Sequence, residues 1–281
     1  MYGLINQPAV FMTEDDLKSR SDELLYGWAV KATGKMEEFW YVTSHYGYEE
    51  GYVPKAAVTP VSLEEVKARE VKLCRRPVID VLSEPKVSAD ILLTVYKGSL
   101  LNVTDELVDG YYKVKLLNGR SGWVSKTALA KRLDEDDFLW SADPEYFLLQ
   151  AKPDEESFRK QVTETAKEYL GCQYRWAGKS PLGIDCSGLV FMSYMLNGVL
   201  LWRDAEIKEA WPVHEIEFED LRPGDLIYFP GHIAMYLGHG KYINSTGYEE
   251  HFGVAISSLR KEDPDYRADL FQMIEKCGSL F

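Results

Sequence analysis

The stretch GIDCSGLVFMSYML, residues 183–196, places a cysteine between two polar residues and in front of a long apolar run. Cys186 follows Asp185 and precedes Ser187, and the run behind them is apolar apart from Ser193. We expect a helix that begins with Asp185 or a neighbour as N-cap and is buried nearly all round. The thiol would then lie in the first turn, where free backbone N–H groups and the helix dipole favour the thiolate.

A cysteine on an apolar helix is also a common packing residue, so Cys186 alone does not indicate an enzyme. A base would change that interpretation. Residues 221–247, LRPGDLIYFPGHIAMYLGHGKYINSTG, predict three short strands, with a glycine-bounded turn between the last two. His232 opens the middle strand and therefore has the context of a base that could serve the thiol.

The register of these strands would decide whether His232 has an orienting partner. If Ala234 lies opposite Asn244, the side chains of His232 and Asn244 are diagonal neighbours on one face, with Cβ atoms about 7–8 Å apart. A cysteine, a histidine and an amide that fixes the ring are the nucleophile, base and orienting group of papain-like acyl transfer. The sequence thus predicts a cysteine nucleophile in an α+β domain.

The composition fits a folded protein whose partner is not a nucleic acid. The chain has 281 residues, a hydrophobic fraction of 46% and a formal net charge of −13. Its length predicts two or three compact units, and its acidic balance without a basic cluster argues against binding a phosphate backbone. The four cysteines have no CxxC spacing, which gives no indication of a zinc site or a disulfide scaffold.

The first 20 residues have neither a basic region nor a continuous apolar region of the kind found in signal peptides. Nor does any run of about 18 apolar residues occur, so we expect no membrane segment. Free thiols fit a reducing compartment. We therefore expect a cytoplasmic protein, and the sequence leaves its oligomeric state open.

An internal repeat occupies the first half of the chain. WYVTSHYGYEEGYVPKAAV (40–58) aligns without gaps on YYKVKLLNGRSGWVSKTAL (111–129), which matches Gly51 with Gly122 and Val53 with Val124. Alternating residues and the Asn-Gly turn predict short strands and small β-barrels. The Gly-Trp-Val strand resembles that of bacterial SH3-like modules. For most of the aromatic residues in the two aligned stretches, ordinary packing in or on the barrels is the alternative interpretation.

The domain organisation follows from these patterns. We expect two small all-β SH3-like barrels at 1–62 and 63–132, an acidic linker at 133–155, and an α+β papain-like catalytic domain at 156–281. ESFRKQVTETAKEYLG (156–171) predicts the first helix of that last domain, closed by a glycine.

The later half resembles the NlpC-type (NlpC/P60) cysteine peptidases, which cleave bacterial cell-wall peptides. The matching text covers most of residues 160–260, and it consists of YRWAG (174–178), DCSGLV (185–190), LRPGDLIYF (221–229), HIAMYLG (232–238) and YINSTG (242–247).

The resemblance assigns roles to four residues. It implies Cys186 as nucleophile, His232 as base and Asn244 as the third, orienting residue, where many members carry histidine instead. Tyr174 matches a tyrosine whose hydroxyl helps to hold the substrate carbonyl, with ordinary packing as the alternative. No metal or organic cofactor is implied.

A narrower resemblance concerns the substrate. GVLLWRDAEIKEAW (198–211) is similar to a segment of γ-D-glutamyl-L-diamino acid endopeptidases that carry N-terminal SH3-like modules. It implies that Asp204, as a buried carboxylate, binds the free amine of an N-terminal L-Ala. Asp185 and Ser187 would contact the peptide backbone.

In that subgroup the first SH3-like module closes the substrate groove. Its contacts would come from SDELLYG (21–27) and YGYEEGY (46–52), with Glu23 and Tyr48 as candidates and Glu49 as an alternative. A solvated run of charges is the other interpretation of both stretches.

The hypothesis is therefore a cysteine endopeptidase that hydrolyses the γ-D-Glu to L-diamino acid bond of murein peptides with a free L-Ala, as in cell-wall recycling. An amidase or acyltransferase on the same scaffold is one alternative. A non-catalytic protein that binds wall peptides is another. The sequence does not distinguish lysine from diaminopimelate as the diamino acid.

Overall fold

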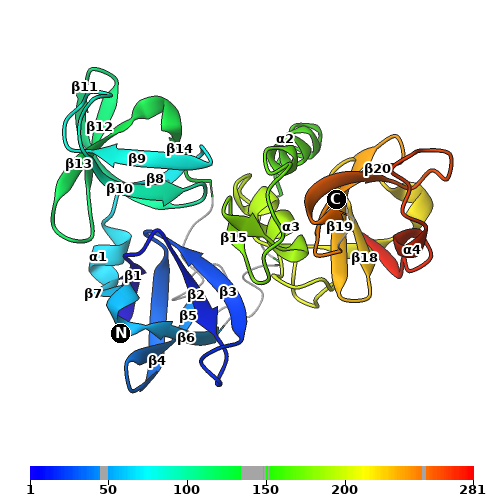
Figure 1. The fold of residues 1–281 in the computed structure, drawn as a ribbon, viewed down its shortest axis with the longest axis horizontal. Helices are drawn as coiled ribbons and strands as arrows, with labels where there is room; N and C mark the ends of the chain where they lie inside the picture. Colours follow the sequence, from blue (N-terminus) through cyan, green and yellow to red (C-terminus); the bar gives the residue numbers. More distant parts are fainter. Residues whose placement is uncertain (45–49, 134–147, 149, 151, 249–250) are drawn as a thin grey trace. The chain divides into compact units, whose positions relative to one another are not determined.

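The computed structural model describes the whole chain except residues 45–49, 134–147, 149, 151 and 249–250 (Figure 1). The chain divides into two compact units, Met1–Trp140 and Ser141–Phe281. The domain boundaries drawn from the sequence remain predictions. In the described part of the chain, no helix combines the length and the apolar character that a membrane crossing would need.

Each half of the first unit is a seven-stranded antiparallel sheet. The strands of the first sheet are β1 (Tyr2–Ile5), β2 (Ala9–Thr13), β3 (Arg20–Leu25), β4 (Ala29–Met36), β5 (Phe39–Ser44), β6 (Glu50–Pro54) and β7 (Val58–Val61). Those of the second are β8 (Val71–Cys74), β9 (Val78–Leu82), β10 (Ile91–Tyr96), β11 (Leu100–Val108), β12 (Tyr111–Lys115), β13 (Ser121–Ser125) and β14 (Leu129–Lys131). Between them lies the short helix α1 (Leu63–Lys67), and the turns η1 (Lys55–Ala57) and η2 (Lys126–Ala128) precede the last strands.

The two sheets have one topology, which confirms the repeat found in the sequence. Their strand orders are β3-β2-β6-β5-β4-β1-β7 and β10-β9-β13-β12-β11-β8-β14, so each strand of one has its counterpart in the other. Gly51 and Gly122 occupy equivalent places in β6 and β13. A Cβ at Gly51 would come within 2.8 Å of Met12 Cγ on β2, and one at Gly122 within 2.5 Å of Val81 Cγ1 on β9. Glycine recurs because the neighbouring strand approaches too closely for a side chain.

A short segment of the first module packs into the second. The hydroxyl of Tyr26 accepts a hydrogen bond from the backbone N–H of Leu117 at 2.8 Å, and the indole N–H of Trp28 donates to the carbonyl of Gly98 at 2.9 Å. Gly27 lies between them at φ +80°, where a Cβ would meet the carbonyl oxygen of Leu100 at 2.0 Å. The two modules therefore share part of one core.

The second unit is an α+β domain. Its helices are α2 (Glu155–Lys167), α3 (Cys186–Met195) and α4 (Ala268–Phe271), and a 3-10 turn, η4, spans Phe218–Asp220. Its strands are β15 (Lys179–Ser180), β16 (Gly183–Ile184), β17 (His214–Ile216), β18 (Leu226–Phe229), β19 (His232–Gly238), β20 (Lys241–Thr246), β21 (Gly253–Ser258) and β22 (Lys276–Ser279). Six of them form an antiparallel sheet in the order β17-β22-β18-β19-β20-β21, and β15 pairs with β16.

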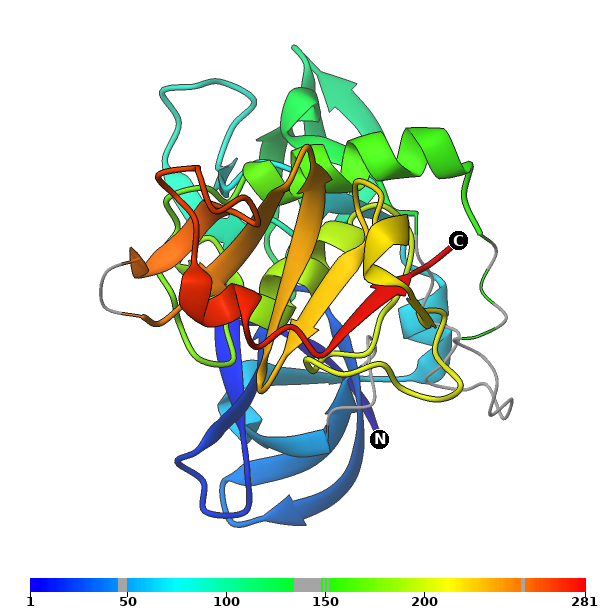
Figure 2. The same cartoon turned by 90° about the vertical axis from the view of Figure 1, so that its right-hand side faces the viewer.

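The helix α3 is the centre of this domain. It packs against β19 and β20 of the sheet and against α2 (Figure 2). Every residue of α3 is buried, as the apolar run predicted, and Asp185 caps it by accepting a hydrogen bond from the N–H of Gly188 at 2.6 Å. The three strands predicted within residues 221–247 are confirmed as β18, β19 and β20.

The helix α2 differs in detail from the prediction. It ends at Lys167, four residues before the glycine expected to close it, and Gly171 instead lies in a turn at φ +79°. The expected apolar face is buried at Phe158, Val162 and Ala166. Leu170 is exposed, because it lies beyond the last helical turn.

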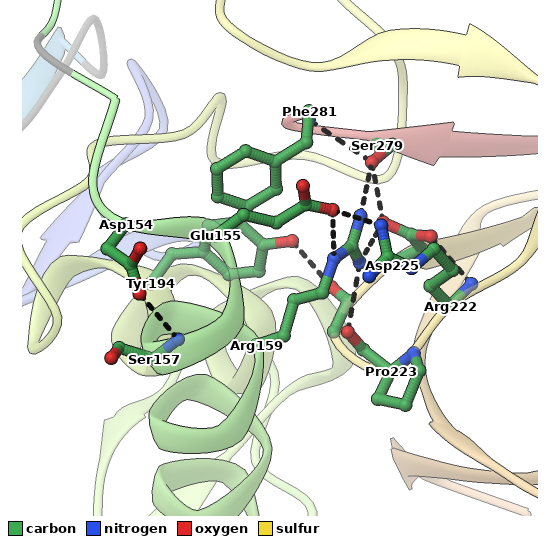
Figure 3. A network of polar contacts seen from close by, with 11 residues as sticks. Asp154, Glu155, Ser157, Arg159, Tyr194, Arg222, Pro223, Asp225, Ser279 and Phe281 are labelled. Carbon is green, nitrogen blue, oxygen red and sulfur yellow. Dashed lines mark hydrogen bonds and ion pairs between the residues drawn. The ribbon is translucent and has the colours of Figure 1, made fainter.

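A buried ion pair joins α2 to the sheet (Figure 3). Arg159 Nη1 lies 2.7 Å from Asp225 Oδ1 and also donates to the carbonyl of Pro223 at 3.0 Å. Ser279 of β22 donates to the same carboxylate oxygen at 2.6 Å. The hydroxyl of Tyr194 on α3 donates to the carbonyl of Gly224 at 2.6 Å. The Arg-Pro-Gly-Asp turn before β18 is therefore tied to both helices.

Candidate active site

Cys186 is the first residue of α3. The residue is 8% exposed, so it is buried at the start of the helix. The first N–H groups of a helix have no partner within the helix, which makes them available to a negative charge at this position. Local structure thus presents the thiol at the end of a rigid, buried element.

His232 and Asn244 meet on adjacent strands. The pairing of Met235 with Ile243 and of Tyr236 with Tyr242 sets a register that, continued along the strands, brings Ala234 opposite Asn244, as the sequence predicted. His232 Nε2 lies 3.2 Å from Asn244 Oδ1. An amide oxygen only accepts hydrogen bonds, so Nε2 carries the hydrogen and Nδ1 is left with a free lone pair.

The strand of the histidine also reaches the cysteine. The helix α3 packs against β19, and the backbone N–H of Ile233, directly after His232, makes a hydrogen bond that lowers the pKa of Cys186. The fold therefore brings together three residues that lie up to 58 positions apart in the chain, from Cys186 to Asn244.

Burial dominates the titration of the thiol. Burial, and after it the charge of Asp185, raise the pKa of Cys186 to about 11. Hydrogen bonds from the N–H groups of Ile233 and Ser187, and the charge of Arg203, act in the opposite direction. The N–H of Ser187 in the first turn lowers the pKa of the thiol, as the sequence predicted, but loss of solvent outweighs it and the net shift favours the protonated thiol.

The pKa of His232 is lowered, which keeps the imidazole neutral and able to accept a proton. Burial lowers the pKa of His232, the hydrogen bond to Asn244 partly offsets this, and the charge of Arg267 lowers the pKa further. At neutral pH the resting pair is a thiol and a neutral imidazole. The thiol then has to lose its proton to His232 as it reacts.

Tyr174 lies in the segment before the β15–β16 hairpin and forms a bridge with Ile184. Burial, with the charges of Cys186 and Asp185, raises the pKa of Tyr174 to about 12. Its hydroxyl therefore stays protonated at neutral pH and is a hydrogen-bond donor near the sulfur. The structure brings this predicted site residue into the neighbourhood of the nucleophile.

Asp185 and Ser187 share a partner that the sequence reasoning missed. Arg203 Nη1 lies 3.0 Å from Asp185 Oδ1 and 2.6 Å from the hydroxyl oxygen of Ser187, and Arg203 Nη2 lies 2.9 Å from Asp185 Oδ2. The sequence did contain an indication of this contact: Arg203 directly follows an apolar run and precedes Asp204, to which the resemblance assigns a role. A charged residue in such a position has to be paired if it is buried.

Asp204 departs from the prediction in one respect. It was expected to be a buried carboxylate, but it is exposed. Arg203 is buried, whereas Asp204, the next residue, is exposed and lines a pocket. Ser187 and Asp204 both line this pocket, together with Val190, Leu201, Trp202, Glu206, Lys208, Trp211, Val213, Leu226, Tyr228 and Ile233. Its role as an amine ligand stays a prediction.

The two candidates in the first module are not placed relative to Cys186. Glu23 is buried in β3, where it pairs with Phe11 of β2. A solvated charge run is therefore the wrong interpretation of Asp22 and Glu23, since both are buried. Tyr48 and its alternative Glu49 lie outside the described residues.

Comparison with known proteins identifies the class. Residues 171–269 match the model of the NlpC/P60 family, and residues 77–130 match that of the bacterial SH3 domain. The chain is 38% identical to the dipeptidyl-peptidase 6 of Lysinibacillus sphaericus, over 99% of this chain and 98% of that protein. It is 27% identical to a γ-D-glutamyl-L-lysine dipeptidyl-peptidase of Bacillus cereus, over 62% of this chain and 49% of that protein.

A solved structure of the same family has a similar fold. An NlpC/P60 family protein from Bacillus cereus superposes with a TM-score of 0.75 at 21% identity, covering 99% of this chain and 98% of the other. The fold is thus a papain-like α+β domain preceded by SH3-like barrels, as the sequence predicted. The chain belongs to the NlpC/P60 family. Within that family it is a hydrolase of the peptidase class.

Proposed function

We propose that this chain is a cysteine endopeptidase that hydrolyses the bond between γ-D-Glu and the L-diamino acid in murein peptides that begin with a free L-Ala. The observation that carries the proposal is the hydrogen bond between His232 and Asn244, on the strands packed against the helix that begins at Cys186. The name of one relative, a γ-D-glutamyl-L-lysine dipeptidyl-peptidase, supports this bond, and the name of the other, a dipeptidyl-peptidase, supports release of a dipeptide.

The first half of the reaction forms an acyl-enzyme. His232 Nδ1 takes the proton of the Cys186 thiol as the sulfur attacks the γ-carbonyl carbon of D-Glu. Negative charge develops on the carbonyl oxygen, and the N–H of Cys186 with the hydroxyl of Tyr174 would stabilise it. The C–N bond then breaks, and the imidazolium gives its proton to the leaving amine of the diamino acid.

The second half returns the enzyme to its resting state. Neutral His232 takes a proton from water, and the water oxygen attacks the thioester carbon. The C–S bond breaks, and the sulfur regains its proton from the imidazolium. Throughout, Asn244 keeps the hydrogen on Nε2, so Nδ1 alone exchanges protons with sulfur, amine and water.

Substrate length would be set at the pocket beside Ser187. The exposed carboxylate of Asp204 can pair with the ammonium of an N-terminal L-Ala, whereas a chain that continued beyond this residue would lack the charge. Release of a dipeptide would follow, in line with the names of the relatives.

A free L-Ala amine requires that the peptide has first been released from whatever acylates it. We therefore propose that the enzyme acts on small wall fragments, as in cell-wall recycling, and that it does so in the cytoplasm. Fractionation of cells followed by immunodetection tests this location, and recovery of the protein only outside the cytoplasm would contradict it.

The activity itself is tested with tripeptides of the form L-Ala-γ-D-Glu-L-diamino acid, with either lysine or diaminopimelate, followed by mass spectrometry between about pH 5 and 9. We expect L-Ala-γ-D-Glu and the free diamino acid. Absence of cleavage over that range would overturn the proposal. Binding without turnover would favour the wall-peptide binding alternative, and cleavage of other amides without a free amine would favour the amidase.

The nucleophile has its own control in that assay. Cys186→Ala should reduce turnover to background while the variant still binds the tripeptide, as measured by calorimetry. Retained turnover in this variant would remove Cys186 from the mechanism.

A further inference from the structure

We propose that Arg203 is a positioning residue of the active site, which holds the two side chains on either side of the nucleophile and cancels the negative charge beside it. The inference rests on the proposed function only in taking Cys186 as the nucleophile.

The geometry of Arg203 supports this role. Its two terminal nitrogens hold both carboxylate oxygens of Asp185, at 3.0 and 2.9 Å, and one of them also donates to the hydroxyl of Ser187 at 2.6 Å. Arg203 is 2% exposed and Asp185 is 6% exposed, so this is a bidentate ion pair withdrawn from solvent. One guanidinium thus fixes the residue before Cys186 and the residue after it.

The ion pair also anchors the start of α3. Asp185 Oδ1 receives the N–H of Gly188 at 2.6 Å in addition to Arg203. The position of this carboxylate sets the first turn of the helix, and the first turn carries the sulfur and its backbone donors. Arg203, sixteen residues downstream of Ser187, therefore helps to fix where the helix that carries the nucleophile begins.

Charge gives the second part of the argument. The charges of Asp185 and Arg203 act on the Cys186 thiol, Tyr174 is coupled to Cys186 and to both of them, and His232 is acted on by the charge of Asp185. The carboxylate of Asp185 opposes ionisation of Cys186, and Arg203 favours it. Without Arg203, a desolvated carboxylate would lie unpaired one residue from the sulfur, and the thiolate would form less readily.

Ser187 adds a link to the substrate pocket. Because Arg203 donates to the Ser187 oxygen, the hydroxyl hydrogen remains for another acceptor, and Asp185 Oδ1 is a weak one at 3.5 Å. Ser187 lines the pocket that Asp204 also lines. One segment thus supplies both Arg203, which contacts the residues on either side of the nucleophile, and Asp204, which lines the pocket.

The test measures the reactivity of Cys186 directly, without any peptide substrate. The rate of alkylation by iodoacetamide is followed for each cysteine by mass spectrometry of digests, at fixed pH well below the midpoint of the thiol, where the rate is proportional to the thiolate population. Cys172, whose sulfur lies 3.2 Å from the carbonyl oxygen of Pro181, is the internal reference in every digest.

We expect Arg203→Met to slow alkylation of Cys186 about threefold or more, because the charge of Arg203 lowers the pKa of the thiol and the smaller thiolate population is only partly offset by its greater nucleophilicity. Arg203→Lys should restore part of the rate, because it returns the charge but not the bidentate contact. The double variant Arg203→Met with Asp185→Asn should alkylate faster than Arg203→Met alone, because it removes both charges.

Equal alkylation rates in the wild type and in a folded Arg203→Met variant would overturn the proposal. If that variant does not fold, Arg203→Lys decides, because it keeps the charge and loses only the bidentate contact: alkylation of Cys186 as fast as in the wild type would overturn the proposal. Where Arg203→Met folds, a double variant that alkylates no faster than Arg203→Met would also overturn it. Loss of tripeptide cleavage with an intact alkylation pattern would instead count against the proposed function.

Discussion

His232 Nε2 and Asn244 Oδ1 lie 3.2 Å apart across β19 and β20, and this contact fixes which nitrogen of the imidazole carries the hydrogen. Asn244 is buried, and its amide oxygen cannot donate, so the neutral ring is held in the tautomer with hydrogen on Nε2. An amide carries no charge, so it orients the ring without strongly favouring the imidazolium. The pair is therefore suited to a base that stays neutral at rest.

The first prediction concerns this contact. Asn244→Ala should lower kcat about tenfold, the effect of one hydrogen bond of about 1.4 kcal/mol, with a smaller change in KM. Asn244→His should retain most of the activity, because an imidazole nitrogen can accept the same hydrogen. Steady-state kinetics on the tripeptide measure both variants. Equal kcat in Asn244→Ala and the wild type would show that Asn244 does not orient the base.

A second prediction concerns pH. Because burial and the charge of Arg267 lower the pKa of His232, the base remains neutral to a lower pH than an ordinary histidine. The acid limb of kcat/KM should therefore lie below the usual histidine range, with activity present above it and lost as pH falls through it. Arg267→Gln removes one of the causes and should move this limb to higher pH. An unchanged limb in that variant would exclude Arg267 from tuning the base.

The third prediction concerns the terminal amine. Acetylation of the L-Ala nitrogen should reduce kcat/KM about tenfold or more, as expected for loss of a hydrogen bond between charged groups. Asp204→Asn should reduce cleavage of the free-amine tripeptide to a similar extent and should not affect the acetylated one further. Glu206→Gln, which changes another carboxylate that lines the same pocket, is the matched control. Additive losses from acetylation and Asp204→Asn would separate Asp204 from the amine.

Much of this site follows from local sequence patterns, because helix starts and short strands depend on nearby residues. Asp185 as N-cap, the apolar run of α3 and the glycine-bounded turn before Lys241 each specify an element, and strand periodicity then brings Asn244 beside His232. The repeat likewise predicted one topology for two modules, because matched glycines mark the same close approach.

The features that the sequence did not predict all depend on which residues become buried in the folded domain. Arg203 and Asp204 are adjacent and oppositely charged, and nothing local indicates that the first is buried and the second exposed. The pKa of Cys186 depends on the same question. A helix start favours the thiolate, but the extent of burial, which is a property of the whole domain, decides the direction of the shift.

The last prediction tests the ion pair that ties α2 to the sheet. Arg159 and Asp225 are both buried, and their terminal atoms lie 2.7 Å apart (Figure 3). Arg159→Met would leave the Asp225 carboxylate without its positive partner, although Ser279 and the N–H of Arg222 still donate to it. We expect a loss of about 3–5 kcal/mol in the free energy of unfolding, measured by denaturant titration.

Lys160→Met provides the control, because it removes the same charge from an exposed neighbour on α2 and should change stability by less than about 0.5 kcal/mol. The double variant Arg159→Met with Asp225→Asn should lose less than Arg159→Met alone, since no buried charge then remains unpaired. If the double variant were as unstable as the sum of the two single changes, the contribution of Arg159 would come from its packing against Phe281, at 5.1 Å from the ring centre, and not from its charge.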